Sequence, residues 1–414
     1  MPKLPIASSI LLATVLYAGQ GMGQDGTAPP MAQGNGPTAA VERLFHSTTP
    51  EADWFTDAFV AAVPPQQVRA IVDGLVADFG AFLAVRLDEG VGTVRLERAD
   101  IPVRISLDTS GRIAGLLFGP PVSTAADPAA IAKQIEAAAS GTVAMLATVD
   151  DATVVDRRSD RSMALASAFK LFVLAAYEAA IAEGRLTRDH VVEVTESDRS
   201  LPSGVLQTLA PGTPITLELL SGLMIQQSDN TATDILMRVV GRGAVDRMMP
   251  EGGPTPTTAE LFKLKAAGQA NRREAFAIGD QAARQAILDG LKVEPLPAAH
   301  QLEATATWRE IEWFATPREL CRVLMDQRAA PALNGVPNPL VARDDWPWIG
   351  FKGGSEFGVL SLSVAGVSPQ GRRACAVVVA NGDAAQPEDR LSFLLSALFR
   401  SLAPDRSPTS QNRE

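Results

Sequence analysis

The order of strand-like and helix-like segments between residues 128 and 402 is the feature that most constrains the fold. Runs rich in β-branched and apolar residues gather at the two ends of this region, and apolar residues at helical spacing fill the interval between them. The expected strands are 142–149, 152–155, 349–352, 359–367 and 374–380. We therefore predict a sheet assembled from both ends of the region, with a helical part between the two strand groups.

Start and stop signals support the helices of this region. Asp127 and Pro128 are typical of an N-cap and first helical position, and Gly184 is typical of a helix end. The expected helices are 128–139, 168–183, 217–227, 231–240, 258–267, 273–291, 315–327 and 387–402.

A small α+β domain is predicted at residues 39–120. Two helical stretches precede four short strands that would form a meander. The helices are expected at 49–63 and 65–78, and the strands at 81–87, 92–97, 101–107 and 113–118. The stretch 121–127, which follows Gly119-Pro120, is the expected linker to residues 128–402. Because the small domain holds no cluster with metal-ligand or catalytic spacing, we interpret it as a binding or docking module rather than a second enzyme, with its partner left open.

The N-terminus has the parts of a secretory signal peptide at residues 1–23. Lys3 supplies the charge, residues 6–18 form an apolar core, and small residues follow at 19–23. The Gly/Pro-rich segment 24–38 and the polar tail 403–414 are expected to be disordered. We therefore expect an exported protein, periplasmic or extracellular, and no apolar run predicts an internal membrane span.

Charge and cysteine content bound the function. The formal net charge of −10 and the absence of a basic stripe argue against a nucleic-acid-binding protein. The two cysteines, Cys321 and Cys375, are compatible with a disulfide in an oxidising compartment, but cysteine is also a common buried apolar residue. We favour two free thiols.

Ser167 and Lys170 form a Ser-x-x-Lys motif at the start of the expected helix 168–183. Residues three apart on a helix lie on one face, so the amine lies within reach of the hydroxyl. A buried lysine near a second cation loses its proton readily and can serve as a base. The helix N-terminus would also favour a developing oxyanion. The motif alone is common.

Two further motifs lie downstream. Ser228-Asp229-Asn230 follows an apolar helical stretch, and Lys352-Gly353-Gly354-Ser355 lies on an expected strand. In this order and these contexts, the three motifs resemble those of the penicillin-recognising serine hydrolases, and among them the class A β-lactamases. The resemblance covers residues 128–402. It implies a class A β-lactamase-like domain, with an antiparallel sheet from both chain ends plus a helical domain, preceded here by a small α+β domain.

The resemblance implies roles for the residues that match. Ser167 corresponds to the acylated nucleophile, Lys170 to the general base or proton shuttle, and Ser228 to the hydroxyl that relays a proton to the leaving nitrogen. Asn230 corresponds to the residue that steadies Lys170 and the substrate amide. Lys352 corresponds to the cation that holds Ser228 and the substrate carboxylate.

The same resemblance places the substrate-binding residues Gly354 and Ser355 beside the nucleophile, where the backbone N–H groups of Ser167 and Ser355 would form an oxyanion hole. The family usually has a hydroxyl residue at the middle position of its Lys-x-Gly motif, and Gly353 removes it here. Part of the carboxylate recognition is therefore lost or moved, with Ser355 as the candidate replacement.

The deacylation carboxylate is the second departure, because no Glu-x-x-Leu-Asn string occurs in the chain. Glu260 lies near the expected place, but Thr257-Thr258-Ala259-Glu260 is typical of a capping box, which we favour for it. Three other glutamates, Glu303, Glu310 and Glu312, precede the Ala315-Thr316-Pro317 string without a convincing sequence context.

These features together predict an exported serine hydrolase that forms an acyl-enzyme, without metal or cofactor. Its small-molecule partner would be a β-lactam or related acyl donor, and deacylation would be slow. The domain order and the Lys-Gly-Gly-Ser-Glu string resemble a two-domain subgroup related to a β-lactamase-like protein of the clavulanic acid cluster. That resemblance implies the alternatives of an esterase or peptidase acting on cephalosporin-type esters or peptidoglycan-like substrates. A non-turnover sensor of β-lactams or peptidoglycan is a further alternative.

A Ser-His-Asp hydrolase is the main rival mechanism. The three histidines, His46, His190 and His300, have no Gly-x-Ser-x-Gly elbow to serve, and the latter two lie in expected surface loops. A metal hydrolase is disfavoured because no His/Asp/Glu spacing suits a ligand set.

Overall fold

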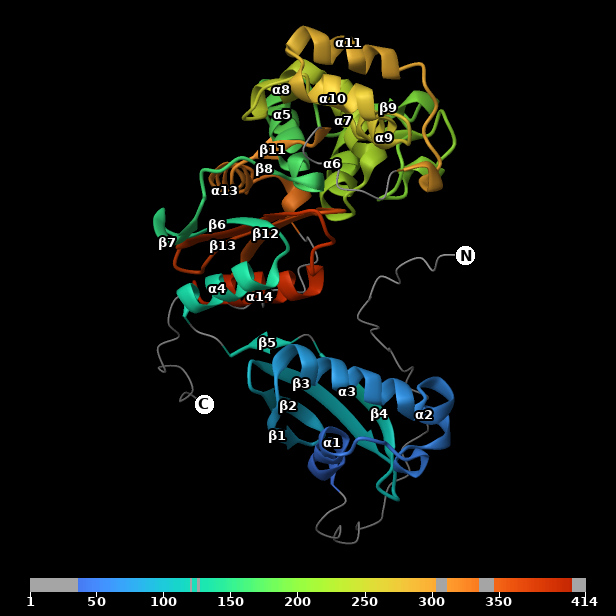
Figure 1. The fold of residues 1–414 in the computed structure, drawn as a ribbon, viewed down its shortest axis with the longest axis vertical. Coiled ribbons are helices and arrows are strands. Elements are labelled where there is room, and N and C mark those ends of the chain that lie inside the picture. The colour runs from blue at the N-terminus through green and yellow to red at the C-terminus, as the bar shows by residue number, and fades with distance from the viewer. Residues whose placement is uncertain (1–35, 120, 125–126, 303–310, 335–345, 404–414) are drawn as a thin grey trace. The chain divides into compact units, whose positions relative to one another are not determined.

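The computed structural model describes residues 36–119, 121–124, 127–302, 311–334 and 346–403. The chain divides into two compact units, Met1–Ala125 and Ala126–Glu414 (Figure 1). The predicted signal peptide (1–23), the greater part of the segment 24–38 and the tail beyond 403 lie outside the described residues. Within the described ranges, no helix is long and apolar enough to cross a bilayer.

The first unit is an antiparallel meander with helices packed against it. The strands are β1 (Phe82–Asp88), β2 (Val91–Leu96), β3 (Ala99–Leu107), β4 (Ile113–Phe118) and the short β5 (Val122–Ser123). The helices are α1 (Pro37–His46), η1 (Ala52–Trp54), α2 (Asp57–Ala62) and α3 (Pro65–Phe79). Helix α1 packs against β1 and β3, and α2 packs against β4. Alternate strand residues such as Val94 and Ile101 are fully buried, which confirms the α+β class predicted for this part.

Three details of the first unit differ from the prediction. Helix α1 begins at Pro37, inside the segment predicted to be disordered, because proline suits the first helical turn and Val41 and Leu44 bury against the sheet. The expected helix 49–63 is reduced to η1 and α2, since Thr56 caps α2 by accepting a hydrogen bond from the Phe59 amide. Within the expected linker, β5 pairs with the end of β3 that β4 leaves open.

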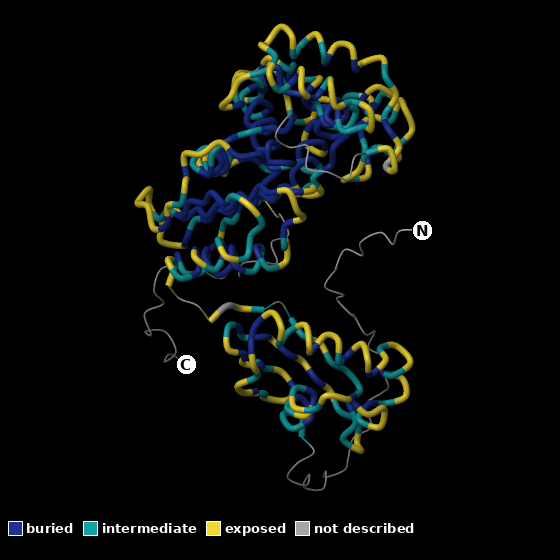
Figure 2. The backbone as a smooth tube through the Cα atoms, viewed as in Figure 1, coloured by how far each residue is buried: buried dark blue, intermediate teal, exposed yellow. Residues whose placement is uncertain are grey.

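The second unit contains a five-stranded antiparallel sheet in the order β12-β13-β14-β6-β7. Its strands are β6 (Thr142–Val149), β7 (Ala152–Arg157), β12 (Trp348–Glu356), β13 (Val359–Val367) and β14 (Arg373–Asn381). The two chain ends meet where β14 pairs with β6, with Val378 opposite Met145. The predicted sheet from both ends of the region is therefore confirmed. Its central strands are buried on both faces, which explains their nearly continuous apolar sequence (Figure 2).

Helices cover both faces of this sheet (Figure 1). Helices α4 (Pro128–Ala138) and α14 (Glu388–Arg400) pack together on one face, and α13 (Pro317–Asp326) packs on the other. The helical part lies on the side of α13 and contains α5 (Lys170–Ala182), α6 (Leu217–Gln226), α7 (Asn230–Val240), α8 (Arg242–Met248), α9 (Thr258–Lys265), α10 (Ala270–Ile278) and α11 (Gln281–Leu291). The described short elements are β8 (Met163–Ala164), η2 (Ala166–Phe169), β9 (Val191–Glu193), η3 (Glu196–Asp198), η4 (Leu206–Thr208), β10 (Pro214–Thr216), η5 (Ala299–Gln301), β11 (Phe314–Ala315) and η6 (Pro331–Leu333).

Helix α5 is the centre of the helical part. Its residues from Lys170 to Tyr177 are all buried, and α6, α7, α8 and α13 contact it. A helix that is apolar all round must be enclosed in this way. The expected helix 273–291 is instead two helices, because Asp280 caps α11 by accepting from the Ala283 amide at 2.8 Å. Helix α8 was not predicted.

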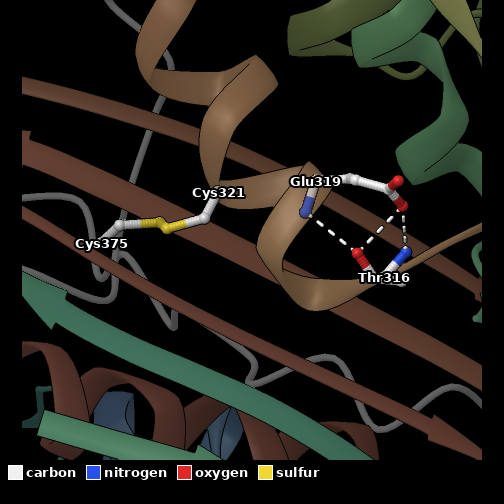
Figure 3. The surroundings of a disulfide bond; sticks show 4 residues. All are labelled: Thr316, Glu319, Cys321 and Cys375. Atoms are coloured by element: carbon white, nitrogen blue, oxygen red, sulfur yellow. Dashed lines mark hydrogen bonds between the residues drawn. A yellow bond between two sulfur atoms is a disulfide. The ribbon is translucent and has the colours of Figure 1, made fainter. Parts of the chain in front are cut away.

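Cys321 and Cys375 form a disulfide between α13 and β14, so the prediction of two free thiols is wrong (Figure 3). The cysteines are 54 residues apart in sequence, and only the packing of α13 across β14 brings their Cα atoms to 6.1 Å. A capping box fixes the start of α13. The Glu319 carboxylate accepts from the Thr316 amide at 2.8 Å, and the Thr316 hydroxyl accepts from the Glu319 amide at 3.1 Å.

Candidate active site

Ser167 lies in η2, a 3₁₀ turn that runs directly into α5. The preceding residue, Ala166, has a φ of +47°, a left-handed conformation that is strained for a residue with a side chain. The Ala166 amide donates to a Glu312 carboxylate oxygen at 3.0 Å. Phe169 stacks on Trp313, with ring centroids 3.6 Å apart. The segment containing Glu312 and Trp313 thus holds the turn that presents Ser167.

Lys170 is fully buried at the start of α5. Its amine donates to the Asn230 side-chain oxygen at 2.6 Å, to the Ser228 hydroxyl at 3.2 Å and to the Ser228 carbonyl. Burial, and secondarily the charge of Lys352, holds the pKa of Lys170 well below its ordinary value, although the charges of Asp234 and Asp229 oppose this. The Lys170 amine therefore gives up its proton more readily than an exposed lysine does.

Ser228 connects the two buried lysines. The Lys352 amine donates to the Ser228 hydroxyl at 3.0 Å and also to the Gly353 carbonyl. Burial lowers the pKa of Lys352 to about 7. The structure therefore brings four predicted residues into one hydrogen-bonded group, which we call the amine cluster: Lys170, Ser228, Asn230 and Lys352.

The loop that contains Gly204 and Val205, before α6, holds the Ser228-Asp229-Asn230 motif in place. Asp229 caps α7 by accepting from the Ala232 amide at 2.8 Å, and its other oxygen accepts from the Val205 and Leu206 amides. A Cβ at Gly204 would lie 2.2 Å from the Asp229 carboxylate, so only glycine fits there. The sequence marked this stretch as a loop but gave no sign that it contacts the motif.

Strand β12 passes directly beside the Ser167 turn. A Cβ at Gly354 would lie 2.4 Å from the Leu165 carbonyl oxygen and 2.6 Å from the amide nitrogen of Ser167. This close approach of two backbones requires glycine at position 354. It brings the predicted binding residues Gly354 and Ser355 to the nucleophile candidate.

Ser167 and Ser228 line one open pocket of about 290 Å³. The Ser355 hydroxyl at its edge donates to the carboxylate of Glu388, the first residue of α14. Glu388 was not predicted, because nothing in its local sequence links α14 to a site on β12. The described lining residues are Ser167, Ser203, Ser228, Gly353, Gly354, Ser355, Leu360, Leu362, Glu388 and Ser392.

Glu260 is not among the described residues that line this pocket. One of its oxygens accepts from the Thr257 amide at 2.8 Å, completing the capping box of α9, and both accept from Arg242 at 2.7 and 2.8 Å. This agrees with the capping-box interpretation.

Glu312 is closer to the nucleophile turn, but its oxygens are also bonded, one to the Ala166 amide and one to Lys265 at 3.1 Å. Glu303 and Glu310 lie outside the described residues. In the described part of the chain, no group of three or more His, Cys, Asp and Glu side chains is arranged to hold a metal ion.

This geometry suits acyl transfer. A hydroxyl on a helix start, a buried amine of lowered pKa and a second hydroxyl between two amines are the parts that such a reaction needs.

Comparisons with known proteins find one matching family model and several similar solved structures. Residues 128–304, less than half of the chain, match the model of the Beta-lactamase enzyme family. A β-lactamase structure from Sphaerobacter thermophilus is similar at 23% identity, covering 66% of this chain and 95% of that chain with a TM-score of 0.47. A β-lactamase from Chitinophaga pinensis has 18% identity, 66% and 97% coverage and a TM-score of 0.44. A class A β-lactamase representative from Bacteroides cellulosilyticus has 18% identity, 67% and 98% coverage and a TM-score of 0.43. No curated protein matches the chain.

Proposed function

We propose that the protein is an exported serine hydrolase of the serine β-lactamase-like family that forms an acyl-enzyme on Ser167, and the match of residues 128–304 to the Beta-lactamase enzyme family supports this proposal. The observation that carries the proposal is the pair of buried amines, Lys170 and Lys352, that both donate to the Ser228 hydroxyl at the edge of the Ser167 pocket. Burial lowers the pKa of both lysines, so each can release a proton that an exposed lysine would keep.

Acylation begins when the Ser167 oxygen attacks the substrate carbonyl carbon and the Lys170 amine takes the serine proton. The tetrahedral intermediate's negative oxygen would be held by the backbone N–H groups of Ser167 and Ser355. The carbon–nitrogen bond then breaks, and the Ser228 hydroxyl passes a proton to the leaving nitrogen while receiving one from a neighbouring lysine. Asn230 holds Lys170 in place throughout, through the 2.6 Å hydrogen bond.

Deacylation requires a water molecule to attack the serine ester, and we propose that this step is slow. Among the described residues that line the pocket, Glu388 is the one with a carboxylate, and this carboxylate accepts a hydrogen bond from Ser355. The Glu260 carboxylate accepts hydrogen bonds from Arg242 and from the Thr257 amide at the start of its helix. The Glu312 carboxylate accepts hydrogen bonds from the Ala166 amide and from Lys265. Because acylation and hydrolysis are separate steps, an acyl-enzyme can form readily and still persist.

The proposed substrates are β-lactams, whose strained amide presents a carbonyl to the serine. Export is supported by the signal-like N-terminus and by the Cys321–Cys375 disulfide, since disulfides persist mainly in oxidising compartments.

Intact-protein mass spectrometry after exposure to a panel of β-lactams tests the proposal. We expect a mass increase equal to the whole β-lactam, located by peptide mapping on Ser167, with a lifetime of minutes or longer. Ser167→Ala must abolish the adduct, whereas Ser392→Ala, in the same pocket, must retain it. Rapid loss of label with turnover of a chromogenic cephalosporin would support an efficient β-lactamase. Label that never dissociates would support the sensor alternative, and no label on Ser167 would refute the proposal.

A further inference from the structure

The charge on the rim of the Ser167 pocket is negative. Among the described residues that line the pocket, Glu388 is the one with a charged side chain. It lies in the first turn of α14, is exposed to solvent, and accepts a hydrogen bond from the Ser355 hydroxyl. Ser392, one helical turn further along α14, lines the same side. We call Ser355, Glu388 and Ser392 the acidic rim.

Two groups that could attract an anion to this rim already donate hydrogen bonds to other residues. The Ser355 hydroxyl donates to Glu388, so a ligand carboxylate would have to break that hydrogen bond. The Lys352 amine is buried and donates to Ser228 and Gly353 rather than toward the rim. Its pKa of about 7 also means that much of its charge is lost at neutral pH.

Position 353 adds no donor, since glycine has no side chain there and its neighbours are Phe351 and Leu362. The surface next to Ser355 therefore offers a ligand one carboxylate, apolar side chains and a hydroxyl whose proton is in use. Such a surface disfavours a ligand anion by like-charge repulsion and favours a neutral or cationic group.

We propose that Glu388 is a specificity-determining residue of the Ser167 pocket, which favours acyl donors carrying a neutral or cationic group beside Ser355 over donors carrying a carboxylate there. This inference rests on the proposed function, because it concerns the substrates of the same serine. It predicts that esterified or amine-bearing acyl donors acylate the protein faster than the corresponding acids.

Three probes that share one acyl group and are anionic, neutral or cationic at the same carboxyl position provide the test: benzylpenicillin, its methyl ester and its diethylaminoethyl ester. The second-order rate constant of Ser167 acylation is measured for each by time-resolved mass spectrometry at low ionic strength. We expect that rate constant to rise about three- to fivefold from acid to neutral ester and again to the cationic ester, the range for an exposed charge pair. Raising the salt concentration to 1 M should reduce the preference, because it shortens the screening length.

Glu388→Gln keeps the size and an acceptor for Ser355 but removes the charge, so it should make the three rate constants nearly equal. Glu388→Asp should keep the order. The matched control is Asp389→Asn, which removes the neighbouring first-turn carboxylate of the same helix without altering a described lining residue of the pocket.

The outcomes separate this inference from the proposed function. Equal rates for the three probes in the natural protein, or an order that Glu388→Gln leaves unchanged, would overturn the inference while Ser167 acylation stands. Slower hydrolysis of the acyl-enzyme in Glu388→Gln, with an unchanged acylation order, would also overturn it and would make Glu388 a deacylation base. If none of the three probes labels Ser167, the proposed function fails and this inference with it.

Discussion

The amine cluster, whose Ser228 lines the Ser167 pocket, and the acidic rim of that pocket differ in burial and in charge. In the cluster, Lys170 and Lys352 are 0% and 3% exposed, and their amines are bonded to neighbouring oxygens. In the rim, Ser355 and Glu388 are exposed. The interaction energy of a buried charge is large and depends on its hydrogen-bond partners, whereas that of an exposed charge is reduced by water and salt. Substitutions in the cluster should therefore change the reaction by orders of magnitude, and substitutions in the rim by small factors.

The largest effect is expected for Lys170→Met, which removes the proposed base while retaining an unbranched side chain. The acylation rate constant should fall about 10²- to 10⁴-fold, the usual contribution of a general base. Stopped-flow kinetics with a chromogenic cephalosporin measures it. Lys133→Met, an exposed lysine on α4, is the control and should leave the rate unchanged. Acylation at the natural rate in a folded Lys170→Met protein would show that Lys170 is not the general base.

The pH dependence of acylation sharpens the role of the second amine. Because burial lowers the pKa of Lys170, its neutral form is more available than that of an exposed lysine, and acylation should decline on acidification as the amine takes up a proton. The charge of Lys352 contributes to that lowering. Lys352→Met should therefore raise the pKa of Lys170 and move the acid limb of the rate profile to higher pH.

The same variant also loses the hydrogen bond to Ser228, so the rate at the optimum should fall about 10- to 100-fold. Lys352→Arg retains a cation and should shift the limb less. An acid limb that stays in place in Lys352→Met would mean that the two amines do not influence each other.

The sequence was informative about the cluster and about Ser355, but it did not point to Glu388 or Ser392 in the rim. Ser167, Lys170, Ser228, Asn230 and Lys352 lie in short motifs whose order was recognisable, and helix and strand periodicity placed those motifs on the correct elements. Glu388 reaches Ser355 only because α14 packs on β13 and β14. No local pattern encodes such a contact.

Two other features had the same origin. Glu312 meets Ala166 across 146 positions of the chain, and Cys321 meets Cys375 across 54. Both contacts follow from tertiary packing, which a single sequence does not display. The nucleophile turn and the sheet were thus predictable as elements, but the residues that brace them were not.

Glu312 allows a test of how much the cluster depends on the turn behind it. Glu312→Ala leaves the Ala166 amide without its acceptor, and a buried unsatisfied amide costs about 1–3 kcal/mol. Because Ala166 is held at a positive φ, we expect Ser167 to lose alignment and acylation to slow by about tenfold. Glu312→Gln retains an acceptor and should lose less. Urea unfolding and acylation kinetics on both variants measure the two effects, and a destabilised Glu312→Ala protein with natural acylation would limit Glu312 to a structural role.

The smallest effect on acylation is expected from removing the disulfide, which lies in neither region of the pocket. Cys321→Ser with Cys375→Ser opens a loop whose ends are 54 residues apart, and the chain-entropy model gives a loss of about 4 kcal/mol in the free energy of unfolding. Cys321 lies on α13, and neither cysteine is among the described lining residues of the pocket, so the rate constant for acylation should change by less than about twofold. Denaturant unfolding with and without reductant measures the first quantity and mass spectrometry the second. Helix α13 contacts α5, which carries Lys170. A large loss of acylation in this double variant, at a temperature where it remains folded, would show that a shift of α13 displaces the amine cluster. The reaction would then depend on the packing of α13 against the sheet as well as on the buried amine cluster and the exposed acidic rim.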